Sequence, residues 1–366
     1  MKRLRIAVVG SGRLGGFHAR KLADRDDVDL VGVVDPDPAA RTPCAAACRT
    51  AAFADHRQLP DGLDAAVLAA PTAAHAALGA ELLERGLHLF VEKPLAATAA
   101  EAEALVALAR RRRRVLQVGH VERFNPALEA ALPCVRNPKY IEAVRAGVVT
   151  FRSMDVGAVL DLMIHDLEIV LALVPGPIRR VDALGLSLLG GHEDVAQARL
   201  QFVSGCVANF SVSRVSYEAV RRMHLWAPGG FAAVDFAARS VDLVRPSAPL
   251  RNGGFDVEAL SAEARERCRE EFAREHLPRR TLHFDAVDAL ALELDDFITA
   301  IRLGRSPRVA GEQGCSAVAL AETILDAIRH HAWDDWRCGL VGPHALPQPH
   351  LIPAPTERPF PRRQAG

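Results

Sequence analysis

Residues 5–15 read Arg-Ile-Ala-Val-Val-Gly-Ser-Gly-Arg-Leu-Gly, a short apolar run followed by three glycines in the spacing GxGxxG. The apolar run predicts a buried strand, and the residues after the glycines predict a helix. In such a turn Gly10 permits the tight bend, Gly12 lets backbone N–H groups approach a pyrophosphate, and Gly15 allows close packing of helix on strand. The context predicts a dinucleotide-binding turn, although an α/β domain without a cofactor can carry a similar glycine turn.

The second predicted strand, Leu30–Val34, ends at Asp35, twenty residues after the last glycine. A carboxylate at this position binds the two hydroxyls of an adenosine ribose and repels a 2′-phosphate, which favours NAD over NADP. Arg41 follows closely and could bind such a phosphate if Asp35 turned away. Arg13 and Leu14, inside the glycine motif, are also expected to contact the cofactor.

The first third of the chain alternates β-branched runs with stretches rich in Ala and Leu, which is typical of a doubly wound parallel sheet. We expect a dinucleotide-binding Rossmann domain over residues 1–123. The strands predicted in it are Arg5–Val9, Leu30–Val34, Ala65–Ala70, Leu87–Val91 and Val115–Val118.

The pattern changes after residue 123, and we expect an α+β domain over 124–337. Tyr140–Thr150 predicts a strand, and Asp155–Val174 predicts one long apolar helix. Alternating segments without intervening helices predict an open-faced, mostly antiparallel sheet. These segments run from Val181 to Val244, and the helices expected to cover them lie around Asp288–Leu303 and Glu312–His331. Residues 256–280 predict an exposed or partner-facing helix, and 338–366 form a proline-rich, extended tail.

Val91-Glu-Lys-Pro94 follows a predicted strand, where ligands gather in open α/β sheets. The chain has four lysines against 41 arginines, so Lys93 indicates a need for a titratable ammonium group. A surface lysine before a helix would give the same pattern.

Asp161 and His165 are four residues apart in the long apolar helix, so both are expected on one helix face. Ionisable groups in such a helix need a partner or a ligand. The pair is therefore either catalytic or a buried hydrogen bond between domains, and its proximity to a dinucleotide site favours catalysis. Asp166 and Glu168 are expected to be structural or exposed.

The sequence resembles the glucose-fructose oxidoreductase and inositol dehydrogenase family, Gfo/Idh/MocA, over about residues 4 to 335. The matching motifs are Gly10-Ser-Gly-Arg-Leu-Gly15, Ala70-Pro-Thr72 with His75, Glu92-Lys-Pro94, Gly119-His-Val-Glu-Arg-Phe-Asn-Pro126 and Asp161-Leu-Met-Ile-His165. The tract from Gln117 to Pro126, together with the segments Arg152–Val156 and Leu160–Leu167, is most similar to a bacterial branch that includes UDP-N-acetylglucosamine 3-dehydrogenases.

The resemblance implies catalytic roles for Lys93, Asp161 and His165, with either the lysine or the histidine as the base. It also implies that Pro71, Thr72 and His75 lie near the nicotinamide, and Glu92 and Lys93 are further expected to contact the cofactor. His120, Arg123 and Asn125 are candidates for substrate contact, although Arg123 and Asn125 could instead cap a hinge between the domains. The resemblance further implies that the domain over 124–337 binds substrate and that its open-faced sheet builds homodimers or homotetramers.

The resemblance therefore implies an NAD-dependent enzyme that transfers a hydride between a sugar carbinol and the nicotinamide, with the 3-hydroxyl of UDP-N-acetylglucosamine as the first candidate. The alternatives are an inositol, polyol or free-sugar dehydrogenase, a reductase for a non-sugar substrate, and a non-catalytic NAD-binding regulator. A regulator should lack Lys93, Asp161 or His165.

The composition limits the partners. The chain has 366 residues with 45 basic and 45 acidic side chains, which argues against nucleic-acid binding. It holds no apolar run long enough for a membrane span. Seven scattered cysteines favour reduced thiols in a cytoplasm. Cys44 and Cys48 could share a helix face and touch a metal, but we interpret them as apolar fillers and expect no metal.

Overall fold

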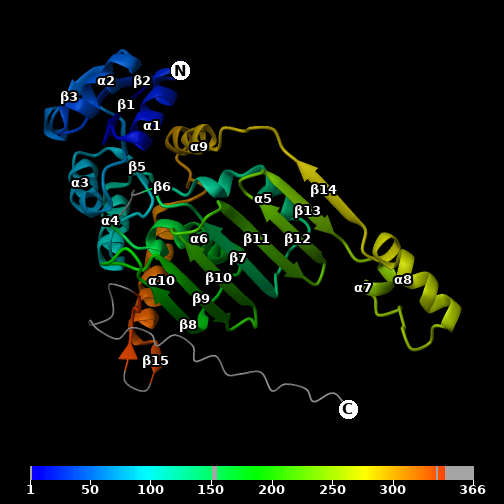
Figure 1. The fold of residues 1–366 in the computed structure, drawn as a ribbon. Coiled ribbons are helices and arrows are strands. Elements are labelled where there is room, and N and C mark those ends of the chain that lie inside the picture. The colour runs from blue at the N-terminus through cyan, green and yellow to red at the C-terminus, as the bar shows by residue number, and fades with distance from the viewer. Residues whose placement is uncertain (1, 151–154, 335–336, 343–366) are drawn as a thin grey trace.

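The computed structural model describes residues 2–150, 155–334 and 337–342 of the chain. These residues form two layered units, an N-terminal α/β unit and a large second sheet with helices on one side (Figure 1). The described helices include none that is both long and apolar enough to cross a membrane.

A six-stranded parallel sheet in the order β3-β2-β1-β4-β5-β6 forms the N-terminal unit, which confirms the predicted doubly wound fold. Its strands are β1 (Leu4–Val9), β2 (Val28–Val34), β3 (Ala51–Phe53), β4 (Ala65–Leu68), β5 (His88–Glu92) and β6 (Leu116–Gly119). The strand order reverses between β1 and β4, so a crevice opens at their carboxyl ends, beside the glycine motif. β3 was not predicted, because its three residues Ala-Ala-Phe carry almost no strand signal.

Helices cover both faces of this sheet. Alternate residues of β1 point to opposite sides: Ile6 and Val8 pack with α1 and α2, whereas Ala7 and Val9 belong to the core that includes α3 and α4. The helices are α1 (Arg13–Ala23), α2 (Pro38–Cys48), η1 (His56–Gln58), α3 (Thr72–Glu84) and α4 (Ala99–Arg112). Local signals explain their ends, since Thr98 begins α4 with a capping box and Arg110 to Arg112 lie in its last turn.

The second unit is an eight-stranded sheet in the order β14-β13-β12-β11-β7-β10-β9-β8. Its strands are β7 (Tyr140–Ala146), β8 (Ile178–Leu186), β9 (Val195–Phe202), β10 (Val207–Ser213), β11 (Val220–Ala227), β12 (Gly230–Asp235), β13 (Ser240–Val244) and β14 (Arg279–His283). The sheet is mostly antiparallel, as predicted, but β7 lies in its centre, parallel to β10 and antiparallel to β11. β7, the first strand of this unit in the sequence, therefore separates β8 to β10 from β11 to β14 in the sheet.

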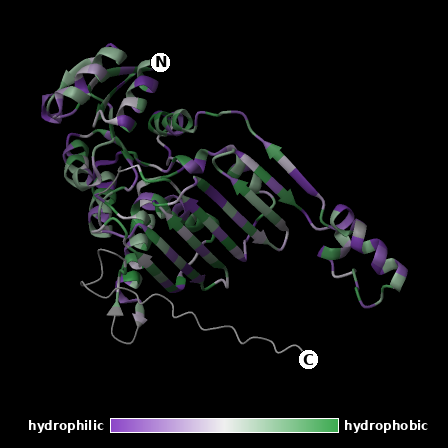
Figure 2. Cartoon of the chain, viewed as in Figure 1, coloured by the Kyte–Doolittle hydropathy of each residue, from purple (hydrophilic) through white to green (hydrophobic). Residues whose placement is uncertain are grey.

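Helices cover one face of this second sheet. The helices between β6 and β8 are η2 (Val121–Phe124), α5 (Pro126–Ala131), the π-helical turn η3 (Val159–Met163) and α6 (Ile164–Leu173), and α10 (Gly311–His330) packs against α6 and β8. Buried and partly exposed residues alternate along β7 and β10, and Figure 2 shows the strands banded in hydropathy. None of the described helices packs on the other face of the sheet.

The helix predicted from Asp155 instead begins at Val159. The carboxylate of Glu193 accepts a hydrogen bond from the Val159 N–H at 2.9 Å, which satisfies one of the free amides of the first turn. The helix ends at Leu173, as the Pro175-Gly-Pro177 signal predicted.

Helix α9 (Ala289–Leu303) was expected to cover the second sheet, and that expectation is wrong. Its buried residues Leu294, Phe297 and Ile298 instead complete the N-terminal core beside Ile6 and Phe90. Figure 1 shows α9 next to α1, whereas α10 lies against the second sheet. Its amphipathic face predicted burial but did not identify the sheet that it packs against.

The predicted exposed helix within 256–280 is α8 (Ala262–His276), which lies at the far end of β14 together with α7 (Ala248–Arg251) (Figures 1 and 2). The strand β14, rich in basic residues, was not predicted. β15 (Ala332–Asp334) and β16 (Arg337–Cys338) form a small hairpin after α10. From residue 343 onward, the predicted proline-rich tail lies outside the described residues.

Candidate active site

A cleft of about 1200 Å³ runs along the carboxyl ends of the Rossmann strands and reaches the second sheet. One half is lined by the glycine motif and Asp35. The other half is lined by Lys93, Asp161 and His165 and by the end of β7. A single cavity therefore joins the predicted cofactor residues to the predicted catalytic ones, and its volume suits a dinucleotide together with a second ligand.

The glycines fit the roles predicted for them. Gly10 has φ +91°, and a Cβ there would lie 2.5 Å from the Ala69 carbonyl oxygen. A Cβ on Gly15 would lie 1.8 Å from the Gly10 carbonyl oxygen, so any side chain would push α1 away from the strand. A Cβ on Gly12 would meet no protein atom within 4 Å, so the space in front of α1 is open to a phosphate. Arg13 and Leu14 also line the cleft.

Asp35 lies at the end of β2 and binds the glycine turn. Its carboxylate accepts hydrogen bonds from the Ser11 N–H at 2.8 Å and from the Asp37 N–H at 2.9 Å. Arg41 donates from Nη1 to the backbone carbonyls of Asp35 and Pro36, at 3.1 and 2.8 Å. The guanidinium is thus held by main-chain oxygens near the place where a 2′-phosphate would lie.

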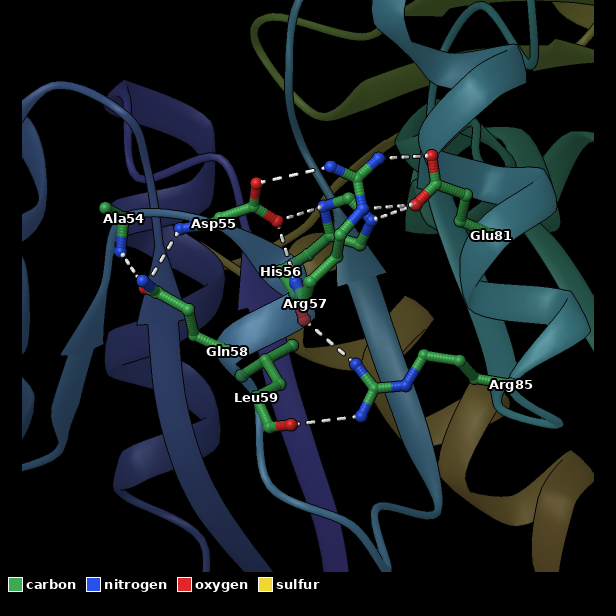
Figure 3. Close-up of polar contacts among 8 residues, drawn as sticks. All are labelled: Ala54, Asp55, His56, Arg57, Gln58, Leu59, Glu81 and Arg85. Carbon is green, nitrogen blue, oxygen red and sulfur yellow. Dashed lines mark hydrogen bonds and ion pairs between the residues drawn. The ribbon is translucent and has the colours of Figure 1, made fainter.

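A loop that the sequence did not single out closes this end of the cleft (Figure 3). His56 Nε2 lies 2.7 Å from Glu81 Oε2, and Arg57 Nη2 donates to Glu81 Oε1 at 2.9 Å. Arg85, the C-cap residue of α3, donates to the His56 and Leu59 carbonyls at 2.9 and 3.0 Å. Arg57 and His56 together lower the pKa of Glu81. Glu81 of α3 and its C-cap residue Arg85 thus hold the loop of residues 54–59 against the cleft. Local sequence patterns do not reveal these contacts, because the loop and the end of α3 are more than twenty residues apart.

The Pro-Thr segment after β4 contributes Pro71 to the cleft wall. Thr72 begins α3 beside it and is not among the described residues that line the cleft. His75 is buried, with Nδ1 2.8 Å from the Pro94 carbonyl oxygen and Nε2 2.8 Å from that of Ala70. His75 therefore links the loops that follow β4 and β5, and it supports the cleft wall without lining the cleft.

Lys93, Asp161 and His165 come together at the other end of the cleft. Lys93 Nζ donates to Asp161 Oδ1 at 2.8 Å and to the Asp161 carbonyl oxygen at 2.7 Å. Among the described residues Asp161 makes no hydrogen bond to His165, because the ammonium group is the stronger partner for its carboxylate. Asp161 lies in the π-helical turn η3, a deformation common at functional sites.

His165 is neutral at physiological pH. Burial, followed by the positive charges of Lys93 and Arg145, holds its pKa well below the ordinary value. Its Nδ1 is buried and has no hydrogen-bond partner among the described residues. His120 packs edge-on against it, with ring centroids 5.9 Å apart, and burial lowers the pKa of His120 to about 3.

The three residues proposed for substrate contact lie behind the cleft surface. His120 is 1 % exposed. Arg123 donates to Glu168 Oε1 at 2.6 Å, and Asn125 accepts from the Ala127 N–H at 3.1 Å as the cap of α5. None of the three is among the described residues that line the cleft, so the geometry of Arg123 and Asn125 matches the alternative of capping between domains.

Two buried ionic clusters support this site, and the sequence analysis missed both. Arg145 on β7 binds Asp166 through Nε at 3.0 Å and Nη2 at 2.8 Å, and binds Glu122 through Nη1 at 3.0 Å. Burial alone would lower the pKa of Arg145, but the two carboxylates raise it. Asp166 therefore has a structural role, as predicted.

The second cluster joins α1, β5 and α9. Glu92 does not face the nicotinamide end of the cleft; its Oε1 lies 2.6 Å from His18 Nε2, beneath α1. Glu293 of α9 is fully buried beside them, and neither of its carboxylate oxygens has a hydrogen-bond partner among the described residues. Burial, with the charge of Glu92, raises the pKa of Glu293 well above its ordinary value. The sequence did not predict this cluster, because His18, Glu92 and Glu293 come from three segments far apart in the chain.

Cys44 and Cys48 are both buried in the N-terminal core, consistent with apolar filling. The described cysteines are all free thiols, and burial raises the pKa of Cys48 to about 11. A thiol with so high a pKa is a poor nucleophile and a poor metal ligand, which applies to Cys48.

A parallel sheet with this glycine turn, and a cleft that ends at a lysine, a carboxylate and a neutral histidine, define an NAD-binding oxidoreductase. Residues 4–120 match the oxidoreductase family with an NAD-binding Rossmann fold, and residues 142–232 match the GFO/IDH/MocA C-terminal domain. The chain belongs to the Gfo/Idh/MocA family and is a dehydrogenase that acts on CH–OH groups.

Two relatives with assigned activities align with this protein over most of its length. It is 32% identical over 331 residues to the UDP-N-acetylglucosamine 3-dehydrogenase of Acidithiobacillus ferrooxidans, covering 90% of this chain and 98% of the relative. The solved structure of that enzyme superposes with a TM-score of 0.77 at 31% identity, over 89% of this chain and 98% of its own. Inositol 2-dehydrogenase of Rhizobium meliloti is 26% identical over 345 residues, covering 89% and 97% of the two chains.

Proposed function

We propose that the protein oxidises the 3-hydroxyl of UDP-N-acetylglucosamine with NAD⁺ as the hydride acceptor. The observation that carries the proposal is the single cleft that joins the glycine turn and Asp35 to Lys93, Asp161 and His165. The choice of substrate is supported by the 32% identity to the Acidithiobacillus ferrooxidans enzyme over 90% of this chain.

The cofactor end of the cleft fits a dinucleotide. The backbone of residues 10–15, including Arg13 and Leu14, holds the pyrophosphate where Gly12 leaves open space. Asp35 binds the adenosine ribose, and Arg41, occupied by backbone carbonyls, offers no free guanidinium to a 2′-phosphate. We therefore propose NAD rather than NADP. Pro71 and Thr72 lie toward the nicotinamide end.

When bound, NAD⁺ supplies the acceptor for the hydrogen that leaves the carbinol carbon with its electron pair. His165 takes the hydroxyl proton at Nε2, because Nδ1 is enclosed by protein. Lys93 is fixed by Asp161 and donates a hydrogen bond to the substrate oxygen as negative charge develops. His120 packs behind His165 and keeps its ring in place.

We also propose that the enzyme is a cytoplasmic homodimer or homotetramer assembled through the open face of the second sheet. That face carries an aromatic cluster of Tyr140, Trp226 and Phe231, with ring centroids about 5 Å apart. Such a patch on an uncovered sheet is typical of a protein interface. The free cysteines agree with a reducing compartment. Light scattering of the purified protein tests the assembly, and a monomer at micromolar concentration contradicts it.

The second candidate is an inositol or free-sugar dehydrogenase, because the inositol 2-dehydrogenase relative also matches 89% of this chain. The test is NADH formation by the purified protein with a panel of UDP-sugars, inositols and free hexoses. We expect UDP-N-acetylglucosamine to give the highest kcat/KM, with a product that carries a 3-keto group by NMR. A higher kcat/KM for an inositol or a free hexose overturns the proposal.

A further inference from the structure

One guanidinium group at the substrate end of the cleft has no partner among the residues that the structure describes. Arg221 lies on β11 and lines the cleft. Among the described residues its guanidinium makes no ion pair and no hydrogen bond, whereas that of its neighbour Arg222, on the opposite face of the sheet, binds Asp235 at 3.0 Å. A cation with no partner at the wall of an active site is available to a ligand.

Arg221 is exposed at the cleft and lies beside a second cation, and it acts on the carboxylate of Asp166 through its charge without an ion pair. Arg221 pairs in register with Arg145 on β7, so their side chains leave the sheet side by side on the same face. Arg145 is compensated by Asp166 and Glu122. Both oxygens of Asp166 already accept hydrogen bonds from Arg145, so the second guanidinium has no equivalent partner. Like charges at directly opposite positions of a sheet destabilise it, and an anion between them and the cleft relieves that cost.

Arg221 is close to the reacting groups without belonging to them. Its positive charge contributes to the lowered pKa of His165, after burial and the nearer cations. The strand end beside it is open, because a Cβ on Gly147 would meet no protein atom within 4 Å. A substrate whose carbinol lies at Lys93 and His165 can therefore extend past β7 toward Arg221.

We propose that Arg221 binds the diphosphate of the substrate and selects nucleotide sugars over neutral polyols. A guanidinium donates two parallel hydrogen bonds to a phosphate, a geometry that a hydroxyl-only ligand does not use. Arg145 adds positive potential from behind and is too enclosed, at 4 % exposed, to be the main contact. This inference rests on the proposed function, because it assigns a recognition element to the same cleft.

The direct test is the binding of UDP alone, measured by calorimetry on the full-length protein saturated with NAD⁺, so that UDP cannot occupy the dinucleotide half. We expect Arg221→Gln to weaken UDP binding by about 10- to 100-fold, the contribution of hydrogen bonds to a charged group. Arg221→Lys should recover part of the affinity, since it restores the charge but not the fork. Arg222→Gln, the neighbour on the opposite face, should bind UDP like the parent.

The inference is overturned if the parent does not bind UDP, or if Arg221→Gln binds it as tightly as the parent does. Turnover separates this outcome from a failure of the proposed function. If UDP binds through Arg221 but UDP-N-acetylglucosamine yields no NADH, the diphosphate site stands and the proposed reaction is wrong. With an active substrate, Arg221→Gln should raise KM for the UDP-sugar at least about tenfold while kcat changes little.

Discussion

Lys93 and His165 lie at the reacting end of the cleft, and the glycines and Asp35 lie at the other end. We expect Lys93→Met and His165→Ala to keep NAD affinity within a few-fold, while turnover falls by about 10² to 10⁴. Asp161→Asn should lose less turnover and shift the pH profile, because it loosens Lys93 without removing it. The measurements are NAD titration and kcat. Parent-like turnover in His165→Ala, with a much lower melting temperature, would make this histidine purely structural.

Asp35 joins the end of β2 to the glycine turn through the Ser11 N–H. Asp35→Ala removes the carboxylate that repels a 2′-phosphate, so we expect NAD binding to weaken by about 1.5 to 3 kcal/mol and NADP to gain relative to NAD. Titration of the variant with both cofactors measures the preference. Asp37→Ala, which removes only the exposed cap of α2, is the control and should keep the parent's preference. An unchanged ratio in Asp35→Ala contradicts the ribose assignment.

Glu293 makes stability depend on pH. A carboxyl whose pKa is raised by folding binds its proton more tightly in the folded chain, so stability decreases as pH rises from about 4.5 toward the folded-state pKa. Glu293→Gln keeps the shape without the ionisation. Between about pH 5 and pH 8 we expect its melting temperature to fall less than the parent's. Glu275→Gln, on the exposed side of α8, should follow the parent curve. Parallel curves for Glu293→Gln and the parent would show that this carboxyl does not titrate with folding.

At the scale of single elements, two glycines in the turn between β1 and α1 have different roles: Gly15 is needed for packing, and Gly12 leaves space for a ligand. Gly15→Ala places a Cβ 1.8 Å from the Gly10 carbonyl oxygen, so we expect a lower melting temperature together with lost NAD binding. Gly12→Ala meets no protein atom within 4 Å, so it should melt like the parent yet bind NAD about tenfold or more weakly. Thermal melts and NAD titration of both variants give the comparison. Parent-like NAD affinity in Gly12→Ala would place the pyrophosphate elsewhere.

The elements with strong local signals could be predicted from the sequence. The first strand, the glycine turn and the helix stop at Pro175 each depend on a few adjacent residues, and all three appear in the structure. The strands β3 and β14 were missed, because Ala51–Phe53 is too short and Arg279–His283 too basic to show the usual alternation. Their pairing with neighbouring strands outweighs their weak propensity.

Some residues of the candidate site could likewise be predicted from local sequence patterns, and others could not. Gly10, Asp35 and Lys93 follow strands directly, so the common carboxyl edge of the sheet brings them to one cleft, as local patterns predict. Glu293 and Arg221 come from distant segments. No single-sequence pattern reports which carboxylate meets His18 or which arginine remains unpaired, since both depend on packing of elements far apart in the chain.

At the scale of the whole molecule, the two units share their helices. α10 packs against α4 of the first unit as well as against α6 and β8 of the second. α9 belongs to the first unit by packing although it follows the second sheet in sequence. The chain therefore passes between the two units more than once. The hydrogen bond from Lys93 to the Asp161 carbonyl oxygen also joins the units at the cleft.

This order has a consequence for synthesis on the ribosome. The Rossmann strands emerge first, but Phe297 and Ile298, which pack against Ile6 and Phe90, emerge only after the whole second sheet. During that time the nascent N-terminal unit presents an apolar face to the cytosol or to a chaperone, because the helix that buries it has not been made. The unit that is first in the sequence therefore completes its core only after the second sheet has been made.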